Sequence, residues 1–514
     1  MKRRNFIRSL SSSMIALPIT INKLSIGVLP QELSLFSSIM DSDKVLVLVR
    51  LNGGNDGLNT LVPLDQYDRL YRLRQNVIIP EDSLLNISDT NGFHPNMLRF
   101  HGMYKNGKVG IVQSVGYPNQ NRSHFRSTDI WTSGSSSEEK VSSGWVGRYL
   151  QNRHPEFPKD YPNTSYPDPL AITIGNNVSH TCQGSFSNFS MAVVNPFNLS
   201  PLSVSQEGEL PDNYYGRNIS YLNTAIAQTN AYSAVIERAA NRGNNLSTYS
   251  DNNWLAYQLQ VVARLISGGL KTKIYIVSQG GYDTHSGQVV NNRPLLGAHS
   301  NLLLKLSSAI ASFQQDLERL GLDDRVMGMT FSEFGRRIRS NGSIGTDHGD
   351  AAPMFLFGSC VNPAILGHNP VIPANVNNRA GVPMQYDFRS IYGSVLEDWF
   401  GVEKQEIKEL LYEDYQHQNL ITCGQFVEPA DLTDAFNYPN PFTESTIFTF
   451  ESQNENVQIS LLDSMGREVA QVLNKSLREG KHRIPYTPEN LPPGTYYFNL
   501  RKESGNVTKA IIKL

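Results

Sequence analysis

The 514-residue sequence has few cysteines, no excess of charge of either sign and no long hydrophobic run. Its three cysteines lie far apart, so they form neither a metal-spaced pair nor a disulfide framework, although one bridge between two of them stays open. Lysine and arginine number 45 against 47 aspartates and glutamates, which removes the electrostatic basis for binding nucleic acid or an anionic membrane. No segment is long and apolar enough to predict a transmembrane helix.

The first 40 residues have the layout of an export signal. Lys2, Arg3 and Arg4 precede a short apolar run at residues 14–21, which is too short to span a bilayer. The order Arg-Arg-x-Phe-Ile-Arg resembles a twin-arginine signal, with an ordinary Sec signal as the alternative. We therefore predict an exported protein in which residues 1–40 form the signal and leader.

The last part of the chain, residues 431–514, consists of short alternating segments separated by turns. Glycine and proline residues divide segments of period-two hydrophobicity, a pattern that predicts a small all-β sandwich. The predicted strands are 446–451, 457–462, 482–485, 496–500 and 509–514.

Four motifs in this part of the chain occur in a specific order. They are Asn-Tyr-Pro-Asn-Pro-Phe at 437–442, Asp-Ser-Met-Gly-Arg-Glu-Val at 463–469, Gly-Lys-His at 480–482 and Leu-Pro-Pro-Gly-Thr-Tyr-Tyr at 491–497. Together they resemble the type A C-terminal sorting domain of the type IX secretion system of Bacteroidota. The resemblance implies transport through the periplasm and across the outer membrane, with the type IX machinery as partner and the cell surface or medium as destination. A generic fibronectin-like adhesion module is the alternative.

The region between these ends, residues 41–430, alternates between strand and helix patterns. Apolar runs predict buried strands, and helical periodicity predicts the segments between several of them. The strand–helix–strand order at 273–331 implies parallel strands. We predict an α/β fold with a mostly parallel sheet flanked by helices, and a ligand site beyond the carboxyl ends of the strands. The predicted strands are 45–49, 108–114, 170–174, 273–277, 326–331 and 354–357, and the helices are 221–240, 254–266 and 302–320.

Carboxylates and histidines follow three of these strands, and more lie in a glycine-rich loop before the strand at 354–357. Carboxylates and neutral imidazoles are ligands of zinc, manganese and related ions. Each loop alone has a structural explanation, because Asp and Gly are common turn residues. Their recurrence at successive strand ends predicts a shared divalent-metal site. The candidate ligands are Asp56, Asp283, His285, Glu333, Asp347 and His348.

A polar segment after the strand at 108–114 leads into a predicted helix. Ser123, near its start, is a candidate nucleophile beside a metal, with a role as a simple N-cap as the alternative. His124 could bind the metal or shuttle a proton. Arg122 could hold an oxyanion or form a surface ion pair. These three residues are the predicted catalytic group.

Seven segments of the chain together resemble a family of exported bacterial proteins that carry the domain of unknown function 1501. The family is similar to the alkaline phosphatase and sulfatase superfamily, so the resemblance implies an alkaline-phosphatase-like fold. It also implies one or two divalent metals and a Ser, Thr or modified-residue nucleophile. Glu333 stands where the pattern usually has Asp-His, and the sulfatase motif Cys-x-Pro-x-Arg is missing, which argues against a formylglycine enzyme. The segments are 51–57, 119–134, 144–148, 280–287, 332–336, 346–358 and 386–389.

These features predict a secreted, metal-dependent hydrolase of phosphate or sulfate esters. Its cofactor would be a divalent ion, zinc first, with manganese, magnesium or calcium as alternatives. Its substrate would be a small-molecule or glycan ester. The second hypothesis is a non-catalytic surface protein that binds a glycan or a partner on a degenerate hydrolase scaffold, because fold does not fix function.

Overall fold

The computed structural model divides the chain into two compact units, Met1–Gln425 and Phe426–Leu514. The predicted signal at residues 1–40 lies outside the described residues, except for two short strands, β1 (Ile19–Ile21) and β2 (Leu24–Ile26). Within the described part of the chain, no helix combines the length and apolarity needed to cross a membrane. The described residues are 19–21, 24–26, 44–199, 201–203, 213–291, 293–412, 415–422, 436–438, 440, 442–463, 467–488, 490–503 and 505–513.

The first unit is built on a nine-stranded sheet with the order β15-β7-β14-β11-β3-β10-β8-β9, and β16 also pairs with β7. Neighbouring strands are parallel except at β14, which runs antiparallel to β11 and β7. The predicted mostly parallel α/β sheet is therefore confirmed. The strands are β3 (Val45–Asn52), β7 (Val109–Gly116), β8 (Ala171–Ile174), β9 (Ser190–Val193), β10 (Ile274–Gly280), β11 (Val326–Phe331), β14 (Ala352–Phe357), β15 (Ile365–Leu366) and β16 (Tyr386–Asp387).

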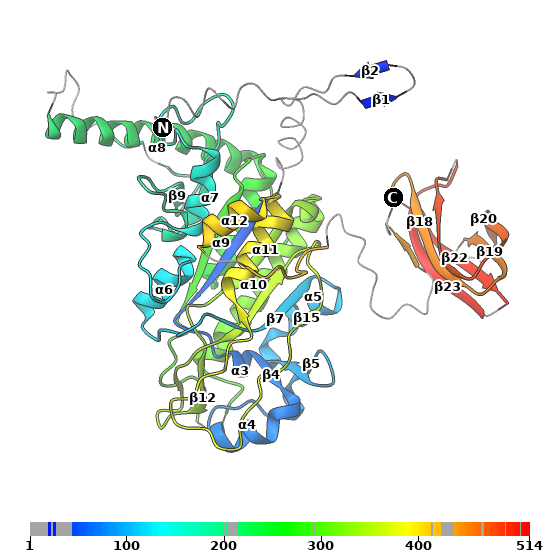
Figure 1. The fold of residues 1–514 in the computed structure, drawn as a ribbon, viewed down its shortest axis with the longest axis horizontal. Coiled ribbons are helices and arrows are strands. Elements are labelled where there is room, and N and C mark those ends of the chain that lie inside the picture. Colours follow the sequence, from blue (N-terminus) through cyan, green and yellow to red (C-terminus); the bar gives the residue numbers. More distant parts are fainter. Residues whose placement is uncertain are drawn as a thin grey trace, which may run out of the picture. The chain divides into compact units, whose positions relative to one another are not determined.

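Helices cover both faces of this sheet (Figure 1). Along β3, Val45, Val47 and Val49 pack into one hydrophobic cluster, while Leu46 and Leu48 pack into another, because successive side chains of a strand point to opposite faces. The first cluster includes α5 (Leu98–Lys105), α8 (Tyr214–Arg242), α9 (Trp254–Ser267) and α10 (Ala298–Leu320). The second includes α6 (His124–Ser133), α7 (Trp145–Arg153), α11 (Phe388–Phe400) and α12 (Lys404–Leu411).

Smaller elements surround the end of the sheet at which the parallel strands finish. After β3 come α3 (Gly57–Thr60) and α4 (Tyr67–Arg74), with a small sheet in the order β4-β6-β5. After β11 comes the antiparallel pair of β12 (Arg336–Ser340) and β13 (Thr346–His348). The small sheet consists of β4 (Leu61–Pro63), β5 (Leu85–Asn86) and β6 (Asn91–Phe93).

The cysteines have different states. Cys182 is free and buried, whereas Cys360, also buried, takes part in a disulfide bond. The single bridge that the sequence left open is therefore present. Disulfides persist in oxidising compartments, so this bond is consistent with an exported protein.

The second unit is all-β and has its own core. Phe448, Val457, Ile459 and Phe498 are among its buried side chains. All five predicted strands are present, with ends that differ from the prediction by at most four residues. The structure adds β20, an edge strand whose side chains are mostly exposed, so its hydrophobic pattern was too weak to predict it. One antiparallel sheet holds β17 (Phe436–Tyr438), β18 (Thr446–Ser452) and β21 (Gly480–Tyr486), and the other holds β20 (Glu468–Leu477), β19 (Glu455–Leu462), β22 (Gly494–Lys502) and β23 (Gly505–Lys513).

Candidate metal centre

The loops that follow β3, β10 and β11 meet at one edge of the sheet, because these three strands are adjacent and parallel. Gly53 lets two of the loops come close together. Its φ is +124°, and a Cβ there would lie 2.4 Å from the backbone nitrogen of Asp283. A glycine at position 53 in the first loop therefore allows close contact with the second loop, which carries Asp283 and His285.

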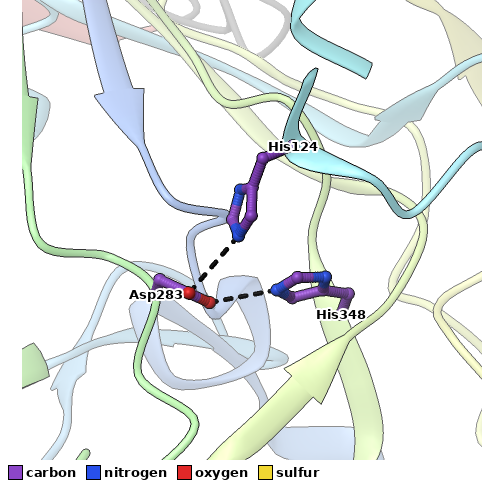
Figure 2. Close-up of side chains that lie close together, drawn as sticks. All are labelled: His124, Asp283 and His348. Atoms are coloured by element: carbon purple, nitrogen blue, oxygen red, sulfur yellow. Dashed lines mark hydrogen bonds and ion pairs between the residues drawn. The ribbon is translucent and has the colours of Figure 1, made fainter. Parts of the chain in front are cut away.

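Three histidines and Asp283 lie close together at this edge. Figure 2 shows two of these histidines, His124 and His348, each in contact with the carboxylate of Asp283. Oδ1 of Asp283 lies 3.0 Å from Nε2 of His348 and 3.2 Å from Nε2 of His285. The Nε2 atoms of His285 and His348 are 2.9 Å apart. Nε2 of His124, at the start of α6, lies 3.3 Å from Oδ2 of Asp283. Four side chains from three separate segments thus bring nitrogen or oxygen atoms close together, and three of them, His124, Asp283 and His348, form a group that could hold a metal ion.

The Nδ1 atom of each histidine, which points away from the cluster, faces a different oxygen. Nδ1 of His124 lies 2.9 Å from Oε1 of Glu333, and Nδ1 of His285 lies 3.0 Å from Oδ1 of Asp347. Nδ1 of His348 lies 2.8 Å from the carbonyl oxygen of Arg122. Glu333 and Asp347 were both predicted as metal ligands, and the structure places them against the histidines, on the far side from the point of convergence.

The buried Arg336 holds the carboxylate of Asp283 in place. Arg336 donates a 2.7 Å hydrogen bond to Oδ1 of Asp283 and others of 2.8 Å to the carbonyl oxygens of Gly54 and Thr346. Burial alone would raise the pKa of Asp283, but the hydrogen bond and the positive charge of Arg336 act against it and this pKa lies well below its ordinary range. Sequence reasoning gave Arg336 no role. Arg336 lies three residues after the predicted ligand Glu333, and this closeness was the signal that could have indicated its role.

Two further pKa shifts favour the protonation states that bind metals. Burial would raise the pKa of Asp347, but hydrogen bonds from Asn341 and His285 and the charge of Arg337 lower it overall. The pKa of His348 is lowered, chiefly because burial disfavours its charged form. Near neutral pH both Asp283 and Asp347 are therefore ionised and His348 is neutral, and for Asp283 and His348 these are the states that metal coordination requires.

The centre is open to solvent on one side. The side chains of Asp283 and His285 are 46% and 44% exposed, whereas that of Glu333 is 1% exposed. The converging atoms can thus be reached from outside, while Glu333 lies beneath them. A ligand from solution could approach the centre on the side of Asp283 and His285.

Asp56 has different neighbours from the other predicted ligands. It is completely buried, forms an ion pair with Arg74 and accepts a 2.6 Å hydrogen bond from Nε2 of Gln288. Oε1 of Gln288 in turn accepts hydrogen bonds from Thr284 at 3.1 Å and Thr346 at 2.6 Å. Asp56 therefore supports the loops that carry the centre.

The predicted catalytic residues lie beside the cluster. Ser123 is the exposed N-cap residue of α6, and its side chain makes no capping hydrogen bond. The side chain of Arg122 binds both oxygens of Asp350, at 2.9 and 2.7 Å, and donates to the carbonyl oxygen of Arg379 at 2.7 Å. The guanidinium of Arg122 is thus held in place by neighbours, while its carbonyl oxygen contacts His348.

A second group of possible ligands consists of Glu397 and Asp398 on α11 and His417 in the segment at 415–422. Both oxygens of Asp398 lie 3.0 Å from Nε2 of His417, and Lys404 lies 3.5 Å from Glu397. These contacts form an ion-pair network that joins the segment at 415–422 to α11. The ammonium group of Lys404 already provides this group with a cationic partner.

Comparison with solved structures gives matches with low identity and low TM-scores. A protein of the alkaline phosphatase superfamily from Vibrio parahaemolyticus has 10% identity and a TM-score of 0.30, and the match covers 85% of this chain and 83% of that one. A sulfatase from Pseudoalteromonas sp. has 9% identity and a TM-score of 0.30, with 93% and 91% covered. A phosphonate monoester hydrolase from Agrobacterium radiobacter has 10% identity and a TM-score of 0.29, with 91% and 89% covered. These values carry no conclusion about activity.

Family comparison confirms both predicted resemblances. No curated protein matches the chain. Two family models match, one in the α/β unit and one at the end of the chain. Residues 221–411 match the family described as protein of unknown function (DUF1501), and residues 437–514 match the secretion system C-terminal sorting domain.

Proposed function

We propose that this protein is a secreted, metal-dependent hydrolase of phosphate or sulfate esters. The observation that carries the proposal is the convergence of three imidazole nitrogens and a carboxylate at a solvent-accessible edge of a parallel sheet. Strand ends are where such folds bind their ligands. The sorting domain at residues 437–514 indicates export to the cell surface or medium by the type IX system. Passage through the periplasm after a twin-arginine signal belongs to the proposal.

The proposed roles follow from the positions of the side chains. A bound divalent ion would act as a Lewis acid on the ester oxygen and lower the pKa of a nearby hydroxyl. Ser123 would be the nucleophile, because its exposed hydroxyl caps no backbone group and the next residue, His124, belongs to the cluster. Its Oγ would bond to phosphorus or sulfur as the bond to the alcohol oxygen breaks, and the serine proton would pass to the leaving alcohol. Water would then cleave the bond to Oγ, release phosphate or sulfate and restore the hydroxyl. Arg122 would act through its carbonyl oxygen, which orients His348.

The test is an ester panel assayed with the full-length secreted protein. We expect the wild type to hydrolyse an aryl phosphate or aryl sulfate, and Ser123→Ala to lose this turnover while keeping its metal content. Its thermal stability should stay the same, because the Ser123 hydroxyl makes no capping hydrogen bond. Ser88→Ala, at an exposed serine in a loop between β5 and β6, is the control and should keep full activity.

Two results would contradict the proposal at different levels. A Ser123→Ala protein with normal turnover would remove Ser123 as nucleophile but leave the hydrolase. A wild type that binds metal and hydrolyses no ester of the panel would end the hydrolase proposal. The non-catalytic surface protein, binding a glycan or a partner, would then be the better description.

A further inference from the structure

We propose that the ion is held by His124, His285, His348 and Asp283, and that Glu333 and Asp347 bind no ion but position two of the histidines. The ligand set of three imidazoles and one carboxylate would select a zinc-like transition metal over magnesium or calcium. This inference rests on the metal dependence of the proposed function and not on ester hydrolysis.

The hydrogen bonds of the three histidines determine where each ring carries its proton. Each Nδ1 faces an oxygen within 2.8 to 3.0 Å, and these oxygens belong to carboxylates or to a backbone carbonyl. Carboxylate and carbonyl oxygens accept hydrogen bonds, so an Nδ1 that faces one of them donates. A neutral ring with its proton on Nδ1 has a lone pair on Nε2. All three Nε2 lone pairs therefore point into the cluster.

A cation between lone pairs at this spacing would satisfy all of them together. Nε2 of His285, Nε2 of His348 and Oδ1 of Asp283 lie within 2.9 to 3.2 Å of one another, and with the protons on Nδ1 all three are acceptors. One proton can join only two of these atoms. A metal ion can join all three together with Nε2 of His124, and an ester oxygen would then bind as a fifth ligand, a number that zinc accepts during catalysis.

The burial of Glu333 supports a positioning role. Its side chain is 1% exposed, and its Oε1 accepts hydrogen bonds from His124 at 2.9 Å and from the backbone of Gly53 at 2.8 Å. A buried carboxylate needs a positive partner. An imidazole bound to a metal provides one through its Nδ1–H, the arrangement in which an outer carboxylate orients a histidine ligand. Asp347 makes the equivalent contact with His285.

The ligand atoms also indicate the class of ion. Magnesium and calcium prefer sites built from oxygen ligands, whereas imidazole suits zinc and other transition metals. Three of the four proposed ligand atoms are nitrogens. The centre should therefore discriminate against both alkaline-earth ions, which the sequence alone left as alternatives.

The test uses full-length protein stripped by a chelator and titrated with Co²⁺, whose visible absorption reports the ligands of the ion. We expect one Co²⁺ per chain, displaced by Zn²⁺ and not by a hundredfold excess of Mg²⁺ or Ca²⁺. Glu333→Gln and Asp347→Asn should weaken binding by about 10- to 100-fold with the absorption bands unchanged, because the ligands stay the same. Asp283→Asn and His285→Gln should change the bands or abolish binding. Circular dichroism would verify that each variant is folded.

Glu318→Gln provides the matched control for Glu333→Gln. Glu318 lies near the end of α10, which leads into the start of β11, so it sits at the opposite end of this strand from Glu333. This variant should bind Co²⁺ like the wild type. Bands in Glu333→Gln that change as they do in Asp283→Asn would make Glu333 a ligand and overturn the inference, as would displacement of Co²⁺ by Mg²⁺. A folded wild type that binds no Co²⁺ would overturn it entirely, whereas binding without ester turnover would contradict only the proposed function.

Discussion

At the scale of single residues, the role of a carboxylate depends on the atom that it faces as much as on its position in the sequence. Asp283 faces two Nε2 atoms, whereas Glu333 and Asp347 face Nδ1 atoms. Asp56 belongs to the same kind of strand-end loop, yet it faces Arg74. The sequence places Asp56, Asp283 and Glu333 after predicted strands and Asp347 in the loop before the strand at 354–357. The direction of each side chain, however, depends on packing between segments far apart in the chain.

Asp56→Asn tests whether Asp56 has a structural role. Arg74 is completely buried, and the substitution would leave it without its negative partner. We expect a loss of about 3–5 kcal/mol in the free energy of unfolding, as is typical when one member of a buried ion pair is removed. Metal content of the folded protein should not change. Denaturant unfolding and elemental analysis measure the two effects.

The exposed Asp65→Asn is the control for this variant and should change stability little, because surface substitutions usually lie within about 0.5 kcal/mol. Loss of metal from Asp56→Asn with little loss of stability would contradict the structural role. Asp56 would then return to the ligand set.

At the scale of elements, the centre depends on the close packing of two loops from parallel strands. β3 and β10 pair along seven residues and end side by side, and Gly53 then lies against the backbone at Tyr282 and Asp283. Arg336, at the start of β12, ties these loops together through their carbonyl oxygens. The loops can therefore hold Asp283 in a fixed place relative to the histidines.

Gly53→Ala should disturb this packing. The added methyl group would meet the backbone nitrogen of Asp283 at 2.4 Å, and alanine rarely adopts a φ of +124°. We expect stability to fall by about 1–3 kcal/mol from backbone strain and metal affinity to fall as well, because Asp283 must move. Co²⁺ titration and thermal unfolding would show both effects.

Gly321→Ala is the control that separates the effect of backbone strain from the effect of displacing Asp283. Gly321 has a φ of +66°, and a Cβ there would meet no atom within 4 Å. Its substitution should lower stability modestly and leave metal affinity at the wild-type value. Equal metal affinities in the Gly53 and Gly321 variants would show that the loop contact does not position Asp283.

At the scale of the whole molecule, the chain combines two units with separate hydrophobic cores. The α/β unit packs its helices on both faces of its sheet, and the C-terminal unit buries aromatic and aliphatic residues of its own strands. Separate cores predict separate folding. The matched sorting domain lies entirely in the second unit.

Deletion of residues 437–514 should therefore leave the α/β unit folded. We expect the truncated protein to keep the thermal transition and Co²⁺ affinity of that unit, and to accumulate in the periplasm without reaching the cell surface. Cell fractionation and unfolding of the purified product measure these outcomes. Normal surface delivery of the truncated protein would contradict the sorting role, and an unfolded product would contradict independent folding.

The sequence by itself determined the fold class, the order of the main strands and helices, and the segments that carry the site. Buried strands and long amphipathic helices have local hydrophobic patterns, so the α/β alternation could be predicted from neighbouring residues, as could the helix at 302–320, which the structure extends to Ala298–Leu320. The sorting domain was equally readable, because its motifs lie in one continuous segment. The exposed edge strand β20 lacks such a pattern and escaped prediction.

Only the tertiary structure decided the role of each candidate residue: whether it belongs to the cluster, supports a histidine as a carboxylate, or forms a buried ion pair. The side chains of His124 and His348 come from segments more than 200 residues apart, and no local pattern encodes the direction of an imidazole nitrogen. The same holds for Arg74, which lies 18 residues after Asp56 on another element yet becomes its partner. These relations arise because packing of distant segments fixes side-chain rotamers, and that information resides in the folded chain as a whole.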